Sequence, residues 1–196
     1  MAQSYEEKVS FSKASIPDVV LLNQDGEQVR FYSDLVKNKV VAINFIFTTC
    51  TTICPPMGAH FSKLQKLMGE RVGKDFHLIS ISVDPLTDTP QRLKAWGEKF
   101  NAGPGWTLLT GPKHDVIKLL KALGVFTADK WDHTPLVLIG NEATGQWARA
   151  EGLASPAKLA EIISYLNRQY GLVQSCHEST GLRGQKVPSA ARATFF

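Results

Sequence analysis

The segment KVVAINFIF, residues 39–47, constrains the fold more than any other part of the sequence. It is an unbroken apolar run rich in β-branched residues, which is typical of a strand buried on both faces of a sheet. The segment FHLISISV, residues 76–83, has the same character. Because such strands need helices on both sides of their sheet, the two segments predict an α/β domain.

The rest of the chain predicts helices that alternate with strands. Helices are expected over residues 55–70 and in TDTPQRLKAWGEKF, PKHDVIKLLKALG and SPAKLAEIISYLNRQYG, the last ending at Gly171. WTLLTG, PLVLIG and GQWARAEG predict strands, and the last two form a hairpin. DVVLLNQDGEQVRFYSDL predicts a hairpin that turns at Asp25-Gly26. This order resembles a thioredoxin-like fold, with a central mixed sheet flanked by helices and an added N-terminal β-hairpin.

The chain divides into one folded domain and two terminal segments. We expect a polar lead-in over residues 1–15, a thioredoxin-like domain over residues 16–171 and an irregular C-terminal tail over residues 172–196. The start lacks the apolar core of a signal peptide, so the protein is either cytoplasmic or separated from a leader or anchor. The net charge of +4 comes from scattered basic residues, which argues against a nucleic-acid partner.

Cys50 and Cys54 stand in FTTCTTICPPM, where the first buried strand gives way to a helix. A helix N-terminus favours thiolate, which is both the nucleophile of redox chemistry and a soft metal ligand. The three intervening residues make a loop that can close into a disulfide or can direct both sulfurs towards one metal ion. Alternatively, the two cysteines are small core residues without a chemical function. Thiolates select Cu(I), Zn or an iron–sulfur cluster, and two of them seldom suffice.

His133, in KWDHTPLVLIG, is the candidate for a third ligand. In a thioredoxin-like sheet the turn before this strand faces the cysteine loop, where thioredoxins carry a cis-proline, for which Thr134-Pro135 is the candidate. A carboxylate beside a ligating histidine often orients it, which suits Asp132. Structural or solvent-exposed roles fit the other soft side chains better: His60, His77, His114 and the tail pair Cys176-His177.

These motifs resemble those of the Sco/SenC family of thioredoxin-like, copper-binding proteins that assist cytochrome c oxidase assembly. The resemblance spans about residues 16–170 and rests on NFIFTTCTTICPPM, SISVDPLTDTPQRLKAW and DHTPLVLIG. It implies an extracytoplasmic, periplasmic location and a membrane anchor that is missing from this chain. Pro135 and the tail depart from the family pattern. The residue roles that the resemblance implies are ligation of copper, as Cu(I) or Cu(II), by Cys50, Cys54 and His133, support of the histidine by Asp132, and turn and helix-cap roles for Asp84 and Asp88.

Three functions follow as hypotheses. The first is a copper metallochaperone for the binuclear copper site of cytochrome c oxidase, with subunit II or another copper-accepting protein as partner. The second is a thiol–disulfide oxidoreductase that reduces the copper-ligand cysteines of its target, with Cys50 attacking, Cys54 resolving and a thiol reductant restoring the pair. The third is a thioredoxin-like peroxidase, which would need a group such as Arg92 or Trp131 at Cys50.

Overall fold

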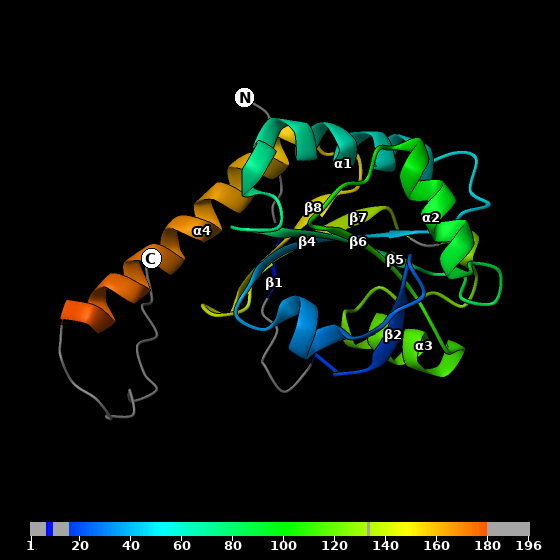
Figure 1. Cartoon of the computed structure of the whole chain (residues 1–196), viewed down its shortest axis with the longest axis horizontal. Coiled ribbons are helices and arrows are strands. Elements are labelled where there is room, and N and C mark those ends of the chain that lie inside the picture. Colours follow the sequence, from blue (N-terminus) through cyan, green and yellow to red (C-terminus); the bar gives the residue numbers. More distant parts are fainter. Residues whose placement is uncertain (1–6, 10–15, 133, 180–196) are drawn as a thin grey trace.

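The protein is built around one eight-stranded sheet with helices on both faces (Figure 1). The computed structural model describes residues 7–9, 16–132 and 134–179. The strand order is β1-β8-β7-β4-β5-β6-β2-β3. The β4–β5 and β5–β6 pairs are parallel and the other pairs are antiparallel, so the sheet is mixed. The predicted fold, a mixed sheet flanked by helices with an N-terminal hairpin, is confirmed.

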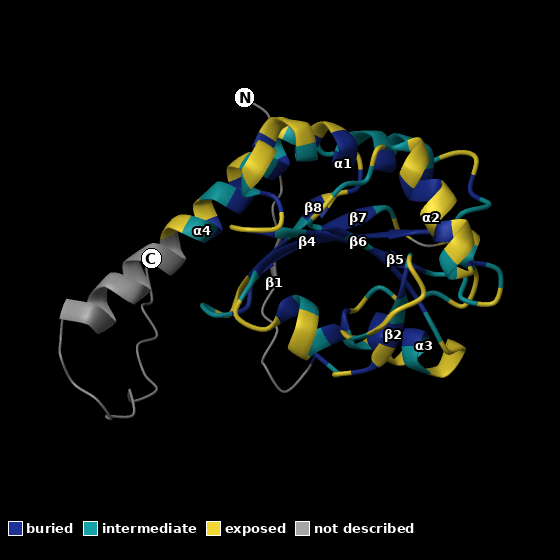
Figure 2. Cartoon of the chain, in the orientation of Figure 1, coloured by how far each residue is buried: buried dark blue, intermediate teal, exposed yellow. Residues whose placement is uncertain are grey.

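The strands at the centre of the sheet are those with the most apolar sequences. Every residue of β4 and of β7 is buried, as Figure 2 shows, because helices cover both of their faces. The hairpin turning at Asp25-Gly26 is made by β2 and β3, and it joins the sheet through β6. The strands are β1 (Glu7–Val9), β2 (Val20–Asn23), β3 (Gln28–Arg30), β4 (Val40–Ile46), β5 (His77–Ser82), β6 (Trp106–Thr110), β7 (Leu136–Asn141) and β8 (Gln146–Glu151).

The helices divide the core into two layers. On one face α1, α2 and α4 bury side chains such as Phe61, Trp96 and Leu159 against the sheet. On the other face α3 and the π-helix η2 bury Leu119 and Phe31. Among the described helices, none combines the length and apolar character needed to cross a bilayer. The helices are η2 (Phe31–Val36), α1 (Cys54–Met68), η3 (Gly69–Arg71), α2 (Pro90–Lys99), α3 (Lys113–Ala122), η4 (Lys130–Asp132) and α4 (Pro156–Ser179).

The two ends of the domain differ from the prediction. Helix α4 continues past Gly171 to Ser179, so the irregular tail expected from residue 172 is wrong as far as residue 179. One glycine inside a helix costs only about 1 kcal/mol, and no proline follows it to stop the helix. Residues 7–9 of the expected lead-in form β1, which pairs with β8. This pairing gives hydrogen-bond partners to the backbone groups of β8 that face away from β7. Residues 176 and 177 fall within α4, but their side chains lie outside the described part of the chain.

Candidate functional site

Cys50 and Cys54 lie where the carboxyl end of β4 leads into α1: Cys50 is in the connecting loop and Cys54 begins the helix. Figure 1 shows the two elements. The chain leaves β4 and turns tightly, since the amide of Cys50 donates to the carbonyl of Phe47 over 3.1 Å. Cys54 is the first residue of α1, and prolines occupy its first turn, where backbone N–H groups have no intrahelical acceptor. The end of β4 therefore fixes where the loop begins, and the start of α1 fixes the position of Cys54.

The two thiols have different environments. The backbone amide of Cys54 donates to Cys50 Sγ over 3.4 Å, and the hydroxyl of Thr52 lies 3.7 Å from the same sulfur. Burial pushes the pKa of Cys50 upwards, but these hydrogen bonds outweigh it and lower the pKa to about 7. Burial raises the pKa of Cys54 to about 12, with further contributions from Cys50 and from the charge of Asp88. Both thiols are free, and the more exposed Cys50 is the one that ionises near neutral pH.

Asp88 ties the segment before the cysteines to the rest of the sheet. Its carboxylate is 1% exposed and accepts hydrogen bonds from the hydroxyl of Ser82, over 2.6 Å, and from both the amide and the hydroxyl of Thr48. Sequence reasoning assigned turn and helix-cap roles to Asp84 and Asp88. The turn is present, but the cap of α2 is Thr89, whose hydroxyl accepts from the backbone of the helix. The only sign of this role of Asp88 in the sequence is that its two partners, Thr48 and Ser82, are polar residues at the ends of otherwise apolar strand segments.

The turn before β7 lies against the end of β4, as the thioredoxin-like topology predicts. Lys130 Nζ lies 2.6 Å from Asp84 Oδ2, above the ring of Phe47 at 5.3 Å. The ring of Trp131 meets Phe47 edge to face, with centroids 5.0 Å apart. These contacts hold η4 beside the strand end from which the cysteine loop starts.

His133 itself lies outside the described residues, so its geometry relative to the thiols stays a prediction. Asp132 is exposed, and its amide donates to the carbonyl of Asp129 over 3.1 Å. The Thr134–Pro135 bond is trans, as are all peptide bonds between residues that the structure describes, so the thioredoxin-like cis-proline is not found there. Within that part of the chain, no three His, Cys, Asp or Glu side chains cluster as a metal site would require.

The thiol pair alone offers two soft donors at one helix start, which suits Cu(I) better than hard cations. The remaining histidines are placed elsewhere. His60 Nδ1 lies 3.1 Å from the carbonyl of Ala154, and His114 is exposed beside Asp115. His77 begins β5, at the end of the sheet opposite the thiols.

Neither residue proposed for a peroxidase is shown in contact with Cys50. Arg92 Nε donates to the hydroxyl of Thr48 over 3.2 Å, and the ring of Trp131 contacts Phe47 and Lys130. A peroxidase needs a hydrogen-bond donor that stabilises the peroxide while the thiolate attacks it. The geometry therefore gives this third hypothesis no support.

Comparisons with known proteins agree with the geometry. The family model described as SCO1/SenC matches residues 8–166. A SCO1 protein homolog of Bacillus subtilis is 45% identical over 91 residues, which cover 45% of this chain and 45% of the relative. The chain thus spans about half the length of that curated relative.

Two solved structures show the same fold. A SCO1/SenC family lipoprotein from Bacillus anthracis matches with 28% identity and a TM-score of 0.68, over 82% of this chain and 97% of its own. The protein BsSco, described with a disulfide switch and as a member of the Sco family of cytochrome c oxidase assembly proteins, matches with 26% identity and a TM-score of 0.63, over 85% of this chain and 99% of its own.

Proposed function

Because the chain belongs to the SCO1/SenC family, we propose that it binds copper and takes part in the assembly of cytochrome c oxidase. The observation that carries this proposal is the Cys50–Cys54 pair at the β4–α1 junction. Its first thiol ionises near neutral pH, and the amide of the second cysteine, at the start of α1, donates to the sulfur of the first. Soft thiolates suit Cu(I), Zn or an iron–sulfur cluster, and membership of the family favours copper among these.

We propose Cys50, Cys54 and His133 as the copper ligands, with Asp132 orienting the imidazole. The ion is cargo, delivered to the binuclear copper site in subunit II of the oxidase or to another copper-accepting protein. A thiol reductant is needed before loading, because a Cys50–Cys54 disulfide would remove both thiolate donors. An extracytoplasmic location agrees with the Bacillus anthracis relative, which is described as a lipoprotein.

The unequal pKa values of the two thiols favour thiol–disulfide exchange as a second function. Cys50 thiolate would attack a disulfide of the target and release one target thiolate. Cys54 would then lose its proton and attack Cys50, releasing the second target thiol. The target gains the two electrons that the Cys50–Cys54 pair loses, and the thiol reductant restores the pair. The same sulfurs serve both functions, so the copper-loaded and disulfide forms exclude each other.

Anaerobic titration of the reduced protein with Cu(I), against a chromogenic chelator, tests copper binding. We expect one ion per chain, and a loss of affinity of at least about tenfold in His133→Ala. His60→Ala is the matched control, because this histidine lies on α1 and contacts the carbonyl of Ala154. Failure to bind at stoichiometric metal would reject the copper function; unchanged affinity in His133→Ala would reject the ligand set.

Reduction of a disulfide peptide by the metal-free protein tests the second function. Cys50→Ser should abolish the reaction, whereas His133→Ala should leave it intact, since the exchange steps use only the sulfurs. If the protein cannot form the Cys50–Cys54 disulfide reversibly, thiol exchange is not its function. The two assays together separate a carrier of copper from a reductant of its target.

A further inference from the structure

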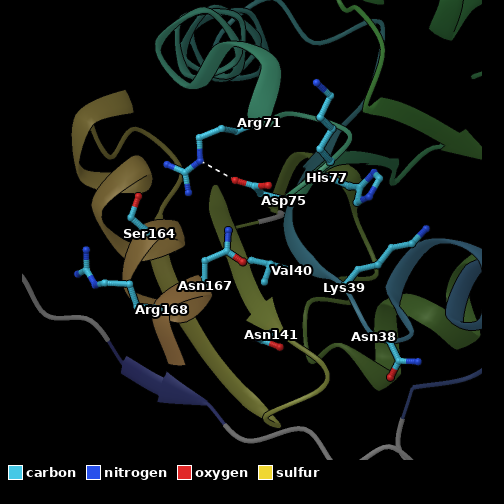
Figure 3. A pocket seen from close by; sticks show the side chains of 11 residues that line it. Asn38, Lys39, Val40, Arg71, Asp75, His77, Asn141, Ser164, Asn167 and Arg168 are labelled. Atoms are coloured by element: carbon cyan, nitrogen blue, oxygen red, sulfur yellow. Dashed lines mark hydrogen bonds and ion pairs between the residues drawn. The ribbon is translucent and has the colours of Figure 1, made fainter. Parts of the chain in front are cut away.

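A hollow, drawn in Figure 3, is lined by residues at the starts of β4 and β5, which is the end of the sheet opposite the thiols. It has a volume of about 680 Å³, within the usual range of small-molecule pockets. Its walls come from the starts of β4 and β5, the segment after α1, the end of β7 and the described part of α4. None of the residues assigned to copper or to thiol chemistry contributes to it, so its function is a separate question.

The walls of this hollow carry an excess of positive charge. Lys39, Arg71, Lys74 and Arg168 line it from different elements, and Asp75 is the one carboxylate among its lining residues. Arg71 Nε pairs with Asp75 Oδ2 over 2.8 Å, which leaves the terminal nitrogens of its guanidinium as donors. The Lys74 pair with Glu70 joins two exposed side chains, and such pairs contribute little. The pocket therefore has more cations than its own carboxylate can neutralise.

Neutral hydrogen-bonding groups stand between these cations. Figure 3 shows Arg71 and Arg168 on the two sides of Ser164, with Asn167 nearby and with Lys39 and His77 across the hollow. Burial and the charge of Lys39 lower the pKa of His77, so its ring is neutral at pH 7 and offers a hydrogen bond without a charge. Guanidinium groups flanking a hydroxyl and an amide match the tetrahedral oxygens of a phosphate group.

We propose that this hollow is a binding site for a phosphate-bearing anion. Positive side chains from separate elements line a space large enough for more than one phosphate group; the ammonium of Lys39 donates to the carbonyl of Asp34, so Arg71 and Arg168 are the main donors to the anion. The phosphate could belong to a small soluble molecule or to a lipid headgroup. Both sources present the same oxygens, and they differ in whether the ligand is free or part of a membrane surface.

Calorimetric titration of the metal-free full chain with pyrophosphate tests the soluble source, and co-sedimentation with phosphatidylglycerol vesicles, against phosphatidylcholine vesicles, tests the lipid. The Arg71→Gln/Arg168→Gln variant should weaken binding at least about tenfold in whichever assay the wild type binds. Lys63→Gln/Lys118→Gln removes the same charge from exposed positions outside the pocket, and it should bind like the wild type. Should the double arginine variant not fold, the single variant Arg168→Gln replaces it, since this side chain is exposed.

Binding in the titration alone assigns the site to a soluble phosphate compound, and binding in the vesicle assay alone assigns it to a lipid headgroup. Absence of binding in both assays, or equal losses in the arginine and lysine variants, overturns the proposal. Cu(I) affinity should be the same in all these variants, because the pocket and the thiols lie at opposite ends of β4. Failure of this inference would therefore leave the copper function untouched.

Discussion

Cys50 should be alkylated readily at neutral pH, whereas Cys54 should stay almost unreactive. Iodoacetamide attacks only thiolate, so its rate reports the fraction of each sulfur that is ionised. The structure lowers the pKa of Cys50 from 9.0 to about 7 and raises that of Cys54 to about 12. A lowered pKa means more thiolate at pH 7, and a raised pKa means less.

The magnitudes follow from these values. At pH 7 about half of Cys50 is thiolate, compared with about 1% of a thiol at 9.0, a gain of roughly fiftyfold. The nucleophilicity of a thiolate falls with its pKa, with a Brønsted coefficient of about 0.4–0.5, so two pKa units make the Cys50 thiolate six- to tenfold less nucleophilic. The alkylation rate of Cys50 at pH 7 should therefore be roughly five- to eightfold higher than that of an ordinary thiol. The same arithmetic makes Cys54 several hundredfold slower than Cys50, before its burial slows it further.

The assay is alkylation of reduced, metal-free protein across a pH series, with each site quantified by mass spectrometry. A Cys176→Ser background removes the third thiol. The rate at Cys50 should inflect near pH 7, and Thr52→Val should move the inflection upwards because it removes the hydroxyl beside the sulfur. The shift should be partial, since the amide of Cys54 still donates. An inflection at or above about pH 8.5, or faster alkylation of Cys54, would refute the reasoning.

Three further substitutions test two polar contacts near the site and the packing of the sheet at its opposite end. Asp88→Ala leaves buried hydroxyl donors without an acceptor and should lower the free energy of unfolding in urea by about 2–4 kcal/mol; a loss under about 1 kcal/mol would contradict this role. Burial raises the pKa of Asp84, but the hydrogen bond and charge of the Lys130 ammonium outweigh burial and lower it. Lys130→Met should therefore lower the free energy of unfolding by about 1–2 kcal/mol at pH 7, and this loss should shrink as the pH falls through the pKa of the carboxylate. Gly140→Ala would place a methyl group 2.1 Å from the ring of Trp147 and should lower the melting temperature by several degrees; an unchanged value would show that the ring can move aside.

Local patterns predicted the elements that hold the thiols. The apolar run that forms β4 and the prolines after Cys54 fixed the strand–helix junction, and Thr89 and Ser155 cap the helices expected after them. These signals lie within a few residues of the features they predict, so one sequence is enough to detect them.

Contacts between distant segments could not be predicted in the same way. The Asp88 carboxylate joins the ends of β4 and β5, and Lys130 reaches Asp84 across 46 positions of the chain. No local periodicity marks such pairs. The end of α4 was also missed, because a single glycine resembles a stop signal even where packing and neighbouring residues carry the helix through. The position of His133 over the thiols rests on the topology and stays a prediction.

Among the residues that the structure describes, the outermost strands of the sheet are β1 and β3, each of three residues. An edge strand offers unpaired N–H and C=O groups with which a strand of another molecule can pair, and a short edge strand offers few of them. The long apolar strands most prone to such association, β4 and β7, are paired on both sides. The folded protein is thereby guarded against edge-to-edge aggregation, and we expect that hazard to arise only when the central strands are exposed by unfolding.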